Sequence, residues 1–341
     1  ITTRLVGSEM CIRDRFKNRV GLITFTKAIP SKIFNYRMSL YKLITPKKFV
    51  ELVAKETTRR VVPVDSTWYM PNLNKDAKAE FKDLERIQNA VYFDIDGIKD
   101  TKSPYPHMVP DLETFNKGMS QLGLKRDDIL VVYDRIGNFS APRCAWTIGL
   151  FEHPNVYLLN NFNLYKGAGY PLDTSKKESF SEYPVSDYHA DSSLAIDEVV
   201  PYENIVDLVQ SGDIRSKYNL VDARALDRFE GKVPEPRPDI PSGHVPGANP
   251  LPFGEVLNDG AKTFPESTEE MASRIDQVTK KLGYTIDPKK PTIAMCGTGV
   301  TGTIIKTALE HAGFKMVRLY DGSWTEWALR SGSELIAKNR D

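Results

Sequence analysis

The sequence has little of what marks several large classes of protein. Its 341 residues include only three cysteines, Cys11, Cys144 and Cys296, and no two of them form a C-x-x-C pair. A disulfide framework, a structural zinc site and thioredoxin-like redox chemistry are therefore disfavoured. The net charge is only +1, which disfavours a protein that binds nucleic acid mainly through its phosphates. The longest apolar runs, such as residues 129–133, are far shorter than the roughly 18 residues that cross a bilayer.

The first 37 residues differ in composition from the rest of the chain. Residues 16–37 carry five basic side chains and no acidic one, interleaved with aliphatic residues. This composition is typical of a mitochondrial transit peptide, but it fits translated upstream sequence before a start at Met38 equally well. We leave both interpretations open and exclude Cys11 from the chemistry. Because cysteines are few, we expect the protein to work in a reducing compartment, the cytosol or the mitochondrial matrix.

From Met38 onward, short β-type runs alternate with helical patterns. This alternation predicts an α/β fold in which helices cover both faces of a mostly parallel sheet. The expected strands are residues 60–64, 129–133, 156–159, 219–221, 292–295 and 316–319. The expected helices are residues 46–55, 112–122, 202–210, 267–282 and 303–312.

The two halves of this region resemble each other. Val64-Asp65-Ser66 is echoed 157 residues later by Val221-Asp222-Ala223, and Val156-Tyr157-Leu158 is echoed 161 residues later by Val317-Arg318-Leu319. A repeat this long indicates a duplicated domain rather than a solenoid unit. We therefore expect two domains, residues 38–165 and 196–341. Residues 166–195, rich in Gly, Pro, Ser and Tyr, are predicted to link them.

One loop combines a cysteine with several glycines at the end of an expected strand. Cys296 follows the strand directly, and Gly297, Gly299 and Gly302 precede the next helix. Glycines let such a loop turn its backbone N–H groups inward, and the helix adds the positive end of its dipole. The loop is therefore expected to hold an anion. A cysteine at this place is expected to have a lowered pKa and to exist partly as thiolate.

Three other interpretations of this loop are weaker. Gly297-x-Gly299-x-x-Gly302 satisfies the dinucleotide-binding fingerprint, and Asp321 lies near where a ribose-binding acid would stand. Only 20 residues follow Asp321, however, too few for the rest of a nucleotide-binding half. A cysteine phosphatase would need an arginine six positions after the cysteine, where this chain has glycine. A packed structural cysteine is the usual fate of a lone thiol, but the strand-to-helix placement argues against it.

On this loop and several other segments, the chain resembles the rhodanese superfamily, specifically its two-domain 3-mercaptopyruvate sulfurtransferases. In the second half the matching segments are Cys296-Gly297-Thr298-Gly299-Val300-Thr301, Asp222-Ala223-Arg224, Arg228-Phe229-Glu230-Gly231, Pro234-Glu235-Pro236-Arg237, Ser242-Gly243-His244-Val245-Pro246-Gly247 and Asp321-Gly322-Ser323-Trp324-Thr325-Glu326-Trp327. In the first half they are Phe93-Asp94-Ile95-Asp96, Ser103-Pro104-Tyr105-Pro106-His107, Tyr133-Asp134 and Ser140-Ala141-Pro142-Arg143. The resemblance extends from about Met38 to Asp341. It is closest to the fungal members that supply sulfur for thiolation of tRNA wobble uridines.

The resemblance implies tandem rhodanese domains of which only the second keeps the nucleophile. Asp134 stands in the first half where Cys296 stands in the second, so the domain over residues 38–165 is predicted to be catalytically silent. Cys296 would attack the sulfur of a donor and carry it as a persulfide to a thiol or a rhodanese-domain protein. The resemblance implies no cofactor. We expect no metal, no direct contact with nucleic acid and no membrane association.

The resemblance also implies roles for the residues around Cys296. Thr298 would pass a proton to the departing pyruvate enolate, and Asp96 and His107 from the first half would orient this relay or set its charge. Arg228 and Arg237 would bind the carboxylate and carbonyl of the donor, since guanidinium forks suit a carboxylate. Without the resemblance, both arginines would be interpreted as surface charges. The loop residues that would hold the transferred sulfur are Gly297, Gly299, Val300 and Thr301.

The charge of the loop predicts the donor. Gly297 and Thr298 are neutral at positions where thiosulfate-preferring relatives carry basic residues, so a dianion would be poorly compensated there. We therefore expect 3-mercaptopyruvate to be preferred and thiosulfate to react more slowly. Two alternatives stay open, a thiosulfate:cyanide sulfurtransferase and a sulfur-carrier binding module without turnover.

A few further residues have structural interpretations. Arg224 is predicted to be a buried ion-pair partner, and His244 is predicted to shape the edge of its domain. Cys144 is expected to be packed and unreactive. Trp324, Trp327 and Leu329 are predicted to share one apolar helical face in the core.

Overall fold

The computed structural model describes residues 39–339. The basic segment expected over residues 1–37 and Cys11 lie outside the described residues. Two parallel sheets organise the described part of the chain. We refer to the sheet formed before residue 160, with its helices, as the first lobe, and to the sheet formed after residue 218, with its helices, as the second lobe.

The sheet of the first lobe is entirely parallel and has the strand order β1-β6-β5-β2-β4. Its strands are β1 (Lys42–Ile44), β2 (Val61–Asp65), β4 (Val91–Tyr92), β5 (Ile129–Tyr133) and β6 (Val156–Leu159). The central strand β5 is buried along its whole length, which explains its unbroken run of apolar residues. A separate antiparallel pair joins β3 (Arg86–Ile87) to β7 (Leu172–Asp173).

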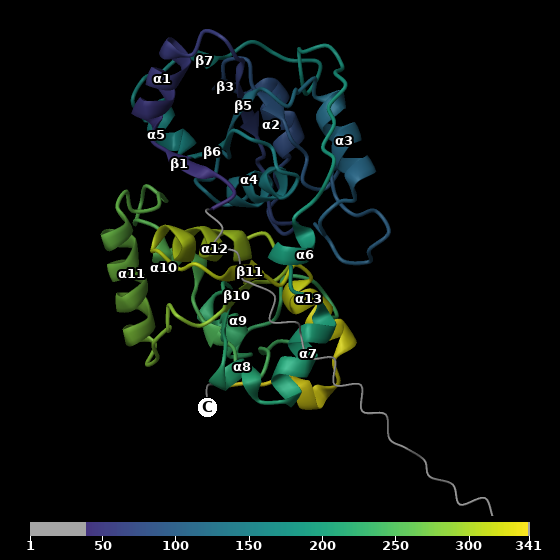
Figure 1. Cartoon of the computed structure of the whole chain (residues 1–341), viewed down its shortest axis with the longest axis vertical. Coiled ribbons are helices and arrows are strands. Elements are labelled where there is room, and N and C mark those ends of the chain that lie inside the picture. The colour runs from purple at the N-terminus through teal and green to yellow at the C-terminus, as the bar shows by residue number, and fades with distance from the viewer. Residues whose placement is uncertain (1–38, 340–341) are drawn as a thin grey trace, which may run out of the picture. The chain divides into compact units, whose positions relative to one another are not determined.

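Helices cover both faces of the first sheet (Figure 1). They are α1 (Pro46–Lys55), α2 (Ala77–Asp83), α3 (Leu112–Gln121), α4 (Ala141–Leu150) and α5 (Phe162–Gly167). Alternate residues of β5 enter different cores. Ile129 and Val131 pack with Phe49 of α1 and Tyr165 of α5, whereas Leu130 belongs to the core that contains α3 and α4.

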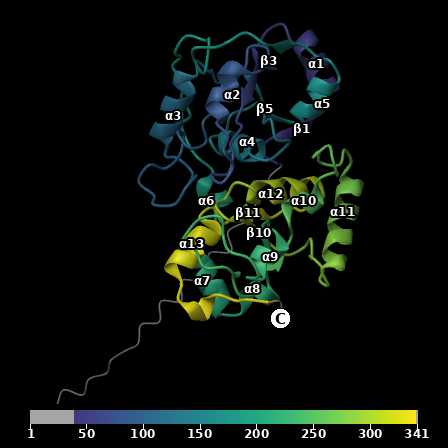
Figure 2. The same cartoon turned by 180° about the vertical axis from the view of Figure 1, so that it is seen from behind.

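The second lobe repeats this arrangement with strand order β11-β10-β8-β9, again all parallel. Its strands are β8 (Asn219–Asp222), β9 (Asn249–Pro250), β10 (Thr292–Met295) and β11 (Val317–Leu319). Its α-helices, labelled in Figures 1 and 2, are α6 (Ala195–Glu198), α7 (Tyr202–Gln210), α8 (Asp213–Ser216), α9 (Leu226–Phe229), α10 (Phe253–Val256), α11 (Thr268–Lys281), α12 (Gly302–His311) and α13 (Ser323–Arg330). A 3₁₀ helix, η1 (Ser333–Leu335), follows α13.

The strand orders of the two sheets correspond along the chain. Strands β6, β5, β2 and β4 lie side by side in the first sheet, and β11, β10, β8 and β9 follow the same order in the second. The edge strand β1 of the first sheet has a counterpart as well, because Val199 forms an isolated parallel bridge to Leu319 of β11. The carboxyl ends of β5 and β10, where Asp134 and Cys296 follow, therefore occupy matching places.

A continuous apolar core joins the two lobes. Buried residues of α4 and of α12, such as Trp146 and Ile304, belong to the same cluster as Val132 and Ala294 from the two sheets. On the other face of the second sheet, Ile293 packs in a separate cluster with residues of α7 and α13. The lobes are also joined by a hydrogen bond between the Tyr41 and Thr307 hydroxyls (2.5 Å).

Most expected elements are confirmed within one or two residues of their predicted ends. The signals at their ends explain this agreement. Thr45 caps α1 with its side chain and is followed by proline, and Ser267 forms a capping box with Glu270 at the start of α11. The short strands β1, β4 and β9 were not predicted, since two or three residues give no recognisable alternation.

The prediction that Leu329 belongs to the core is wrong. Trp324 and Trp327 of α13 are fully buried, but Leu329 is 55% exposed. On a helix with 3.6 residues per turn, Trp324, Trp327 and Ala328 share one face, whereas Leu329 is rotated to the opposite side.

Residues 166–195, expected to form a linker, run along the first lobe. Their strand β7 pairs with β3, and Tyr188 and Ala190 are buried in the shared core. The Asn116 side chain makes two hydrogen bonds to the backbone of Ala190. It accepts one from the Ala190 N–H (2.9 Å) and donates one to the Ala190 carbonyl (3.1 Å). None of the helices described between residues 39 and 339 is long and apolar enough to span a membrane.

Candidate active site

Cys296 lies at the carboxyl end of β10, where the chain leaves the second sheet and turns into α12. Ligand sites of parallel sheets form at this edge, because the loops that follow neighbouring strands meet there. The residue is only 2% exposed, and its sulfur-bearing side chain lines a pocket. Gly297, Thr298, Val300 and Thr301 line the same pocket, whereas Gly299 does not.

The backbone N–H groups of the loop after Cys296 are not engaged in hydrogen bonds within the described part of the chain. Along the chain after Cys296, the first backbone N–H groups that donate hydrogen bonds are those of Thr303 and Ile304, to the carbonyls of Val300 and Thr301. Among the described residues, the amides of residues 297–302 donate to no other group. These amides and the amino end of α12 together provide a positive environment for an anionic sulfur.

The segment at the start of α13 anchors this loop from behind. The Ser323 hydroxyl accepts a hydrogen bond from the Cys296 N–H (3.1 Å) and donates to the Tyr320 carbonyl (2.8 Å). The Gly297 carbonyl accepts both the N–H (3.0 Å) and the hydroxyl (2.8 Å) of Thr325. This segment carries part of the family resemblance, but no role of Ser323 or Thr325 was predicted from it. Their contacts are made 27 and 28 residues away along the chain, which no local pattern reveals.

Gly299 is the loop position where only glycine fits. Its φ is +80°, a region that other residues rarely adopt. A Cβ there would lie 2.7 Å from the Asp321 carbonyl oxygen and 2.9 Å from Nη1 of Arg143. Gly299 therefore serves the site by allowing this close approach rather than by lining the pocket.

A buried arginine of the first lobe holds the loop that follows Cys296. Nη1 of Arg143, on α4, bonds to the Asp321 carboxylate and lies 3.3 Å from the Gly299 carbonyl, and Nη2 bonds to the His107 carbonyl. The other oxygen of Asp321 accepts the Val109 N–H (2.9 Å). Both side chains are almost fully buried. This contact was not predicted, although both residues stand in segments that carry the family resemblance.

Both lobes contribute to the pocket around Cys296. Trp68, Met70 and Phe139 come from the first lobe, and Phe253 and Ile240 come from the second. The rings of Trp68 and Phe139 are stacked with centroids 6.2 Å apart, and Phe139 meets Phe253 edge to face at 5.6 Å. These aromatic residues form an apolar wall opposite the polar loop. The wall was not predicted from the sequence.

The arginines expected to bind the donor are both in this pocket. A Cβ at Gly297 would lie 3.3 Å from Nη2 of Arg228, so this guanidinium faces the loop directly. Arg228 also bonds to Glu235. Arg237 is half-buried, and burial lowers its pKa while the nearby Asp96 and Cys296 act to raise it. Arg224 confirms its expected structural role, since it is buried and paired with Asp222 and Glu235.

Asp96 and His107 lie together, but behind the pocket rather than on its wall. Nδ1 of His107 is 3.1 Å from an Asp96 oxygen, and the other Asp96 oxygen accepts the Trp68 indole N–H (2.7 Å). The Trp68 ring contacts the His107 ring edge to face at 4.8 Å. Burial lowers the pKa of His107, and Asp96 partly opposes this shift. Within the described part of the chain, the Thr298 hydroxyl makes no hydrogen bond that joins it to this pair.

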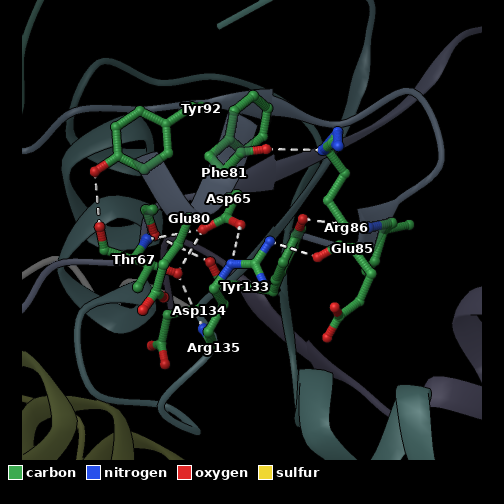
Figure 3. A network of polar contacts seen from close by, with 12 residues as sticks. Asp65, Thr67, Glu80, Phe81, Glu85, Arg86, Tyr92, Tyr133, Asp134 and Arg135 are labelled. Carbon is green, nitrogen blue, oxygen red and sulfur yellow. Dashed lines mark hydrogen bonds and ion pairs between the residues drawn. The ribbon is translucent and has the colours of Figure 1, made fainter. Parts of the chain in front are cut away.

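The matching loop of the first lobe is already occupied by a side chain. The Asp134 carboxylate accepts five backbone N–H groups at 2.7–3.0 Å, those of Ile136, Gly137, Phe139, Ser140 and Ala141. Figure 3 shows Asp134 beside Asp65 and Arg135, at the carboxyl ends of β5 and β2. The Arg135 guanidinium pairs with Asp65, and the backbone N–H of Arg135 donates to the Thr67 hydroxyl (3.0 Å). This loop therefore binds its own anion.

The remaining sequence expectations concern buried groups. Cys144 is fully buried on α4, as expected, and burial raises the pKa of its thiol. His244 is buried at the edge of the second lobe, where its Nδ1 lies 2.9 Å from the Phe229 carbonyl. Among residues 39–339, no group of three or more His, Cys, Asp or Glu side chains is placed to hold a metal ion.

Comparison with known proteins identifies relatives over nearly the whole described chain. Residues 205–330 match the model of the rhodanese-like domain. Thiosulfate sulfurtransferase TUM1 of Saccharomyces cerevisiae is 57% identical over 304 residues, which are 89% of this chain and all of that protein. Its crystal structure superposes with a TM-score of 0.87 over the same shares.

Two further relatives agree with this result. A probable 3-mercaptopyruvate sulfurtransferase of Schizosaccharomyces pombe is 37% identical, covering 85% of this chain and 94% of that protein. The cryo-EM structure of the yeast mitochondrial complex I sub-stoichiometric sulfur transferase subunit is 35% identical, with a TM-score of 0.74 over 88% of this chain and all of that one.

The fold and the cysteine loop, with these similarities, define the class of protein as a sulfurtransferase with the rhodanese fold. The chain belongs to the rhodanese family, in the group that includes TUM1 and the 3-mercaptopyruvate sulfurtransferases. The dinucleotide and phosphatase interpretations of the loop are thereby set aside.

Proposed function

We propose that this sulfurtransferase takes sulfur preferentially from 3-mercaptopyruvate and carries it as a persulfide on Cys296. The observation that carries the proposal is the loop of unpartnered amides around Cys296, faced by Arg228 and Arg237. The amides suit an anionic sulfur, and the guanidinium groups suit the carboxylate of a keto acid. Thiosulfate is the second candidate donor, because the relative TUM1 is a thiosulfate sulfurtransferase.

The reaction consists of two half-reactions. The Cys296 thiolate attacks the thiol sulfur of the donor, the carbon–sulfur bond breaks, and its electron pair leaves with the enolate of pyruvate. Thr298, which lines the pocket two residues beyond the nucleophile, supplies a proton to this enolate through its hydroxyl. An acceptor thiolate then attacks the terminal sulfur, the sulfur–sulfur bond breaks, and the Cys296 thiolate is restored. Ping-pong kinetics follow from this order.

Asp96 and His107 act in this proposal as positioning residues behind Trp68. His107 contacts one oxygen of Asp96, the other oxygen accepts the Trp68 indole N–H, and Trp68 forms part of the pocket wall. Both residues come from the first lobe, so the first lobe shapes the donor site although it carries no nucleophile. Gly297, Gly299, Val300 and Thr301 hold the transferred sulfur through the loop they form.

We further infer that the two lobes are copies of one rhodanese unit, over residues 38–165 and 196–341, and that the first is catalytically silent. The matching strand orders support the duplication. The carboxylate that fills the loop of the first lobe supports its silence, because no thiolate is present at position 134 and the amides already have a partner.

For the cellular role, we propose that the enzyme loads a thiol or rhodanese-domain acceptor that serves 2-thiolation of tRNA wobble uridines. We place it in mitochondria, the cytoplasm or both, and the mitochondrial assembly of one relative supports the first of these. A deletion strain should lose wobble thiouridine, and a pulldown should recover the acceptor protein. Normal thiouridine together with an empty pulldown would exclude this role.

The chemical proposal is tested by pyruvate release and by mass spectrometry. Wild type should release pyruvate from 3-mercaptopyruvate and gain the mass of one sulfur atom on Cys296. Cys296→Ser should lose both signals. Cys144→Ala, at the other described cysteine, should keep both because this thiol is buried in the core. A wild-type protein that gains no sulfur from either donor would instead support the carrier-module alternative.

A further inference from the structure

Two arginines of the donor pocket, Arg224 and Arg228, are in direct contact with two carboxylates, Asp222 and Glu235. Arg224 bonds to Asp222 through Nε and Nη2, at 2.9 and 2.6 Å, and through Nη1 to Glu235 at 2.8 Å. Glu235 continues the chain of contacts, since it also accepts hydrogen bonds from Nε (3.3 Å) and Nη2 of Arg228. Its side chain is only 4% exposed, so water screens these charges weakly.

These contacts leave one cation in the pocket without a bound carboxylate. Asp222 balances Arg224, and Glu235 balances Arg228. Within residues 39–339, no carboxylate lies in ion-pair contact with Arg237, although it lines the same pocket.

The carboxylate that acts most strongly on Arg237 through space, Asp96, is engaged elsewhere. Asp96 acts on Arg237 through space, but its oxygens contact His107, the Trp68 indole and Lys99. The loop residues that face the arginines are neutral.

We propose that Glu235 is the specificity-determining residue for donor charge. It neutralises Arg228, so that Arg237 is the one arginine of the described pocket left to balance the charge of a donor, and the pocket selects a donor with one negative charge over a dianion. This inference rests on the proposed function and adds to it the residue that sets the donor preference.

The physical reason is that a donor with two negative charges responds more strongly to the electrostatic potential of the pocket than a donor with one. Adding one positive charge near the Cys296 loop stabilises a bound dianion about twice as much as a bound monoanion at the same place. Removing the negative charge of Glu235 therefore favours both donors, but it favours thiosulfate more. The same carboxylate that keeps Arg228 in place thus disfavours the dianion.

Glu235→Gln is the direct test, because glutamine keeps the size and the acceptor oxygen and removes the charge. We expect the ratio of kcat/KM for thiosulfate to kcat/KM for 3-mercaptopyruvate to rise about tenfold, or roughly 1.4 kcal/mol. The matched control is Glu203→Gln, which removes a glutamate from a pair with Arg330 (2.6 Å) outside the pocket. The control should change the ratio by less than about twofold. A ratio that stays within twofold of wild type in Glu235→Gln overturns the proposal.

A second variant covers the case in which Glu235→Gln does not fold. Arg228→Gln leaves the charge of Glu235 without this partner, so the same ratio should fall rather than rise. An unchanged or higher ratio in Arg228→Gln contradicts the proposal.

Binding measurements separate this inference from the proposed function. In the Cys296→Ser background, Glu235→Gln should strengthen sulfate binding relative to pyruvate binding about tenfold by calorimetry. If wild type releases no pyruvate but this shift occurs, the proposed donor is wrong and the role of Glu235 stands. If pyruvate is released but neither the kinetic nor the binding ratio moves, the proposed function stands and the role of Glu235 is refuted.

Discussion

Replacing Arg143 by methionine should destabilise the protein more than any change of an exposed arginine. The substitution keeps a long apolar stem but removes the guanidinium that bonds to Asp321, to the Gly299 carbonyl and to the His107 carbonyl. The Asp321 carboxylate would stay buried with only the Val109 N–H as a partner. Breaking a buried ion pair by removing one member costs about 3–5 kcal/mol. For a unit of about 300 residues the entropy of unfolding gives about 1.6 °C per kcal/mol, which predicts a fall in Tm of roughly 5–8 °C.

The double variant Arg143→Met/Asp321→Asn identifies the cause of this loss. The asparagine oxygen can still accept the Val109 N–H, and no charge is then left buried without a partner. Urea unfolding should therefore show the double variant to be more stable than Arg143→Met by about 1–3 kcal/mol. The cycle of two single variants and the double variant gives the coupling energy directly.

Activity provides an independent measurement of the same contact. Arg143 holds the Gly299 carbonyl, so kcat for pyruvate release should fall in Arg143→Met. This fall should be seen at assay temperatures well below the Tm of the variant, where the protein is folded. Arg126→Met is the matched control, since Arg126 bonds to the Phe151 and Glu152 carbonyls within the first lobe and should leave kcat unchanged. A loss of less than about 1 kcal/mol in Arg143→Met, or a double variant no more stable than the single one, would refute the reasoning.

Two further predictions follow from single residues. Gly299→Ala should fold but lose at least about tenfold in kcat/KM, because its Cβ would meet the Asp321 carbonyl oxygen at 2.7 Å and the backbone has a φ of +80°; activity equal to wild type would contradict this. Burial lowers the pKa of His153 to about 4, whereas the unfolded chain protonates near pH 6.5, so the free energy of unfolding should fall by up to about 3 kcal/mol as the pH drops from 6.5 to 4. His153→Gln should flatten this dependence in urea titrations at several pH values, and an unchanged slope would rule out His153 as its source.

The elements that the sequence predicted well are those whose signals are local. The apolar runs of β5 and β10 are buried from end to end, and the helices with strong amino-terminal caps begin where expected. The cysteine loop was recognisable for the same reason, since strand, glycines and helix are consecutive. Leu329 was misplaced because its neighbours Trp324 and Trp327 suggested a wider apolar face than α13 has.

The parts of the site that were missed depend on contacts between distant residues. Arg143 meets Asp321 across 178 residues, and Ser323 supports the Cys296 N–H across 27. Trp68 is held at the pocket by two hydrogen bonds. Its backbone N–H donates to the Ser140 hydroxyl (3.1 Å), and its indole N–H donates to Asp96. Neither periodicity nor spacing encodes such pairs, and the family resemblance marked several of these residues without stating what they touch.

The Asp134 carboxylate also has a consequence for where the structure should change when Cys296 gains a sulfur atom. Its five amide partners are satisfied permanently, and the same loop and helix carry Phe139 and Arg143, which face the second lobe. We therefore expect the first lobe to keep the same shape whether or not Cys296 carries sulfur. Gain and loss of the sulfur atom should change amide hydrogen exchange after Cys296 and leave the loop after Asp134 as it was.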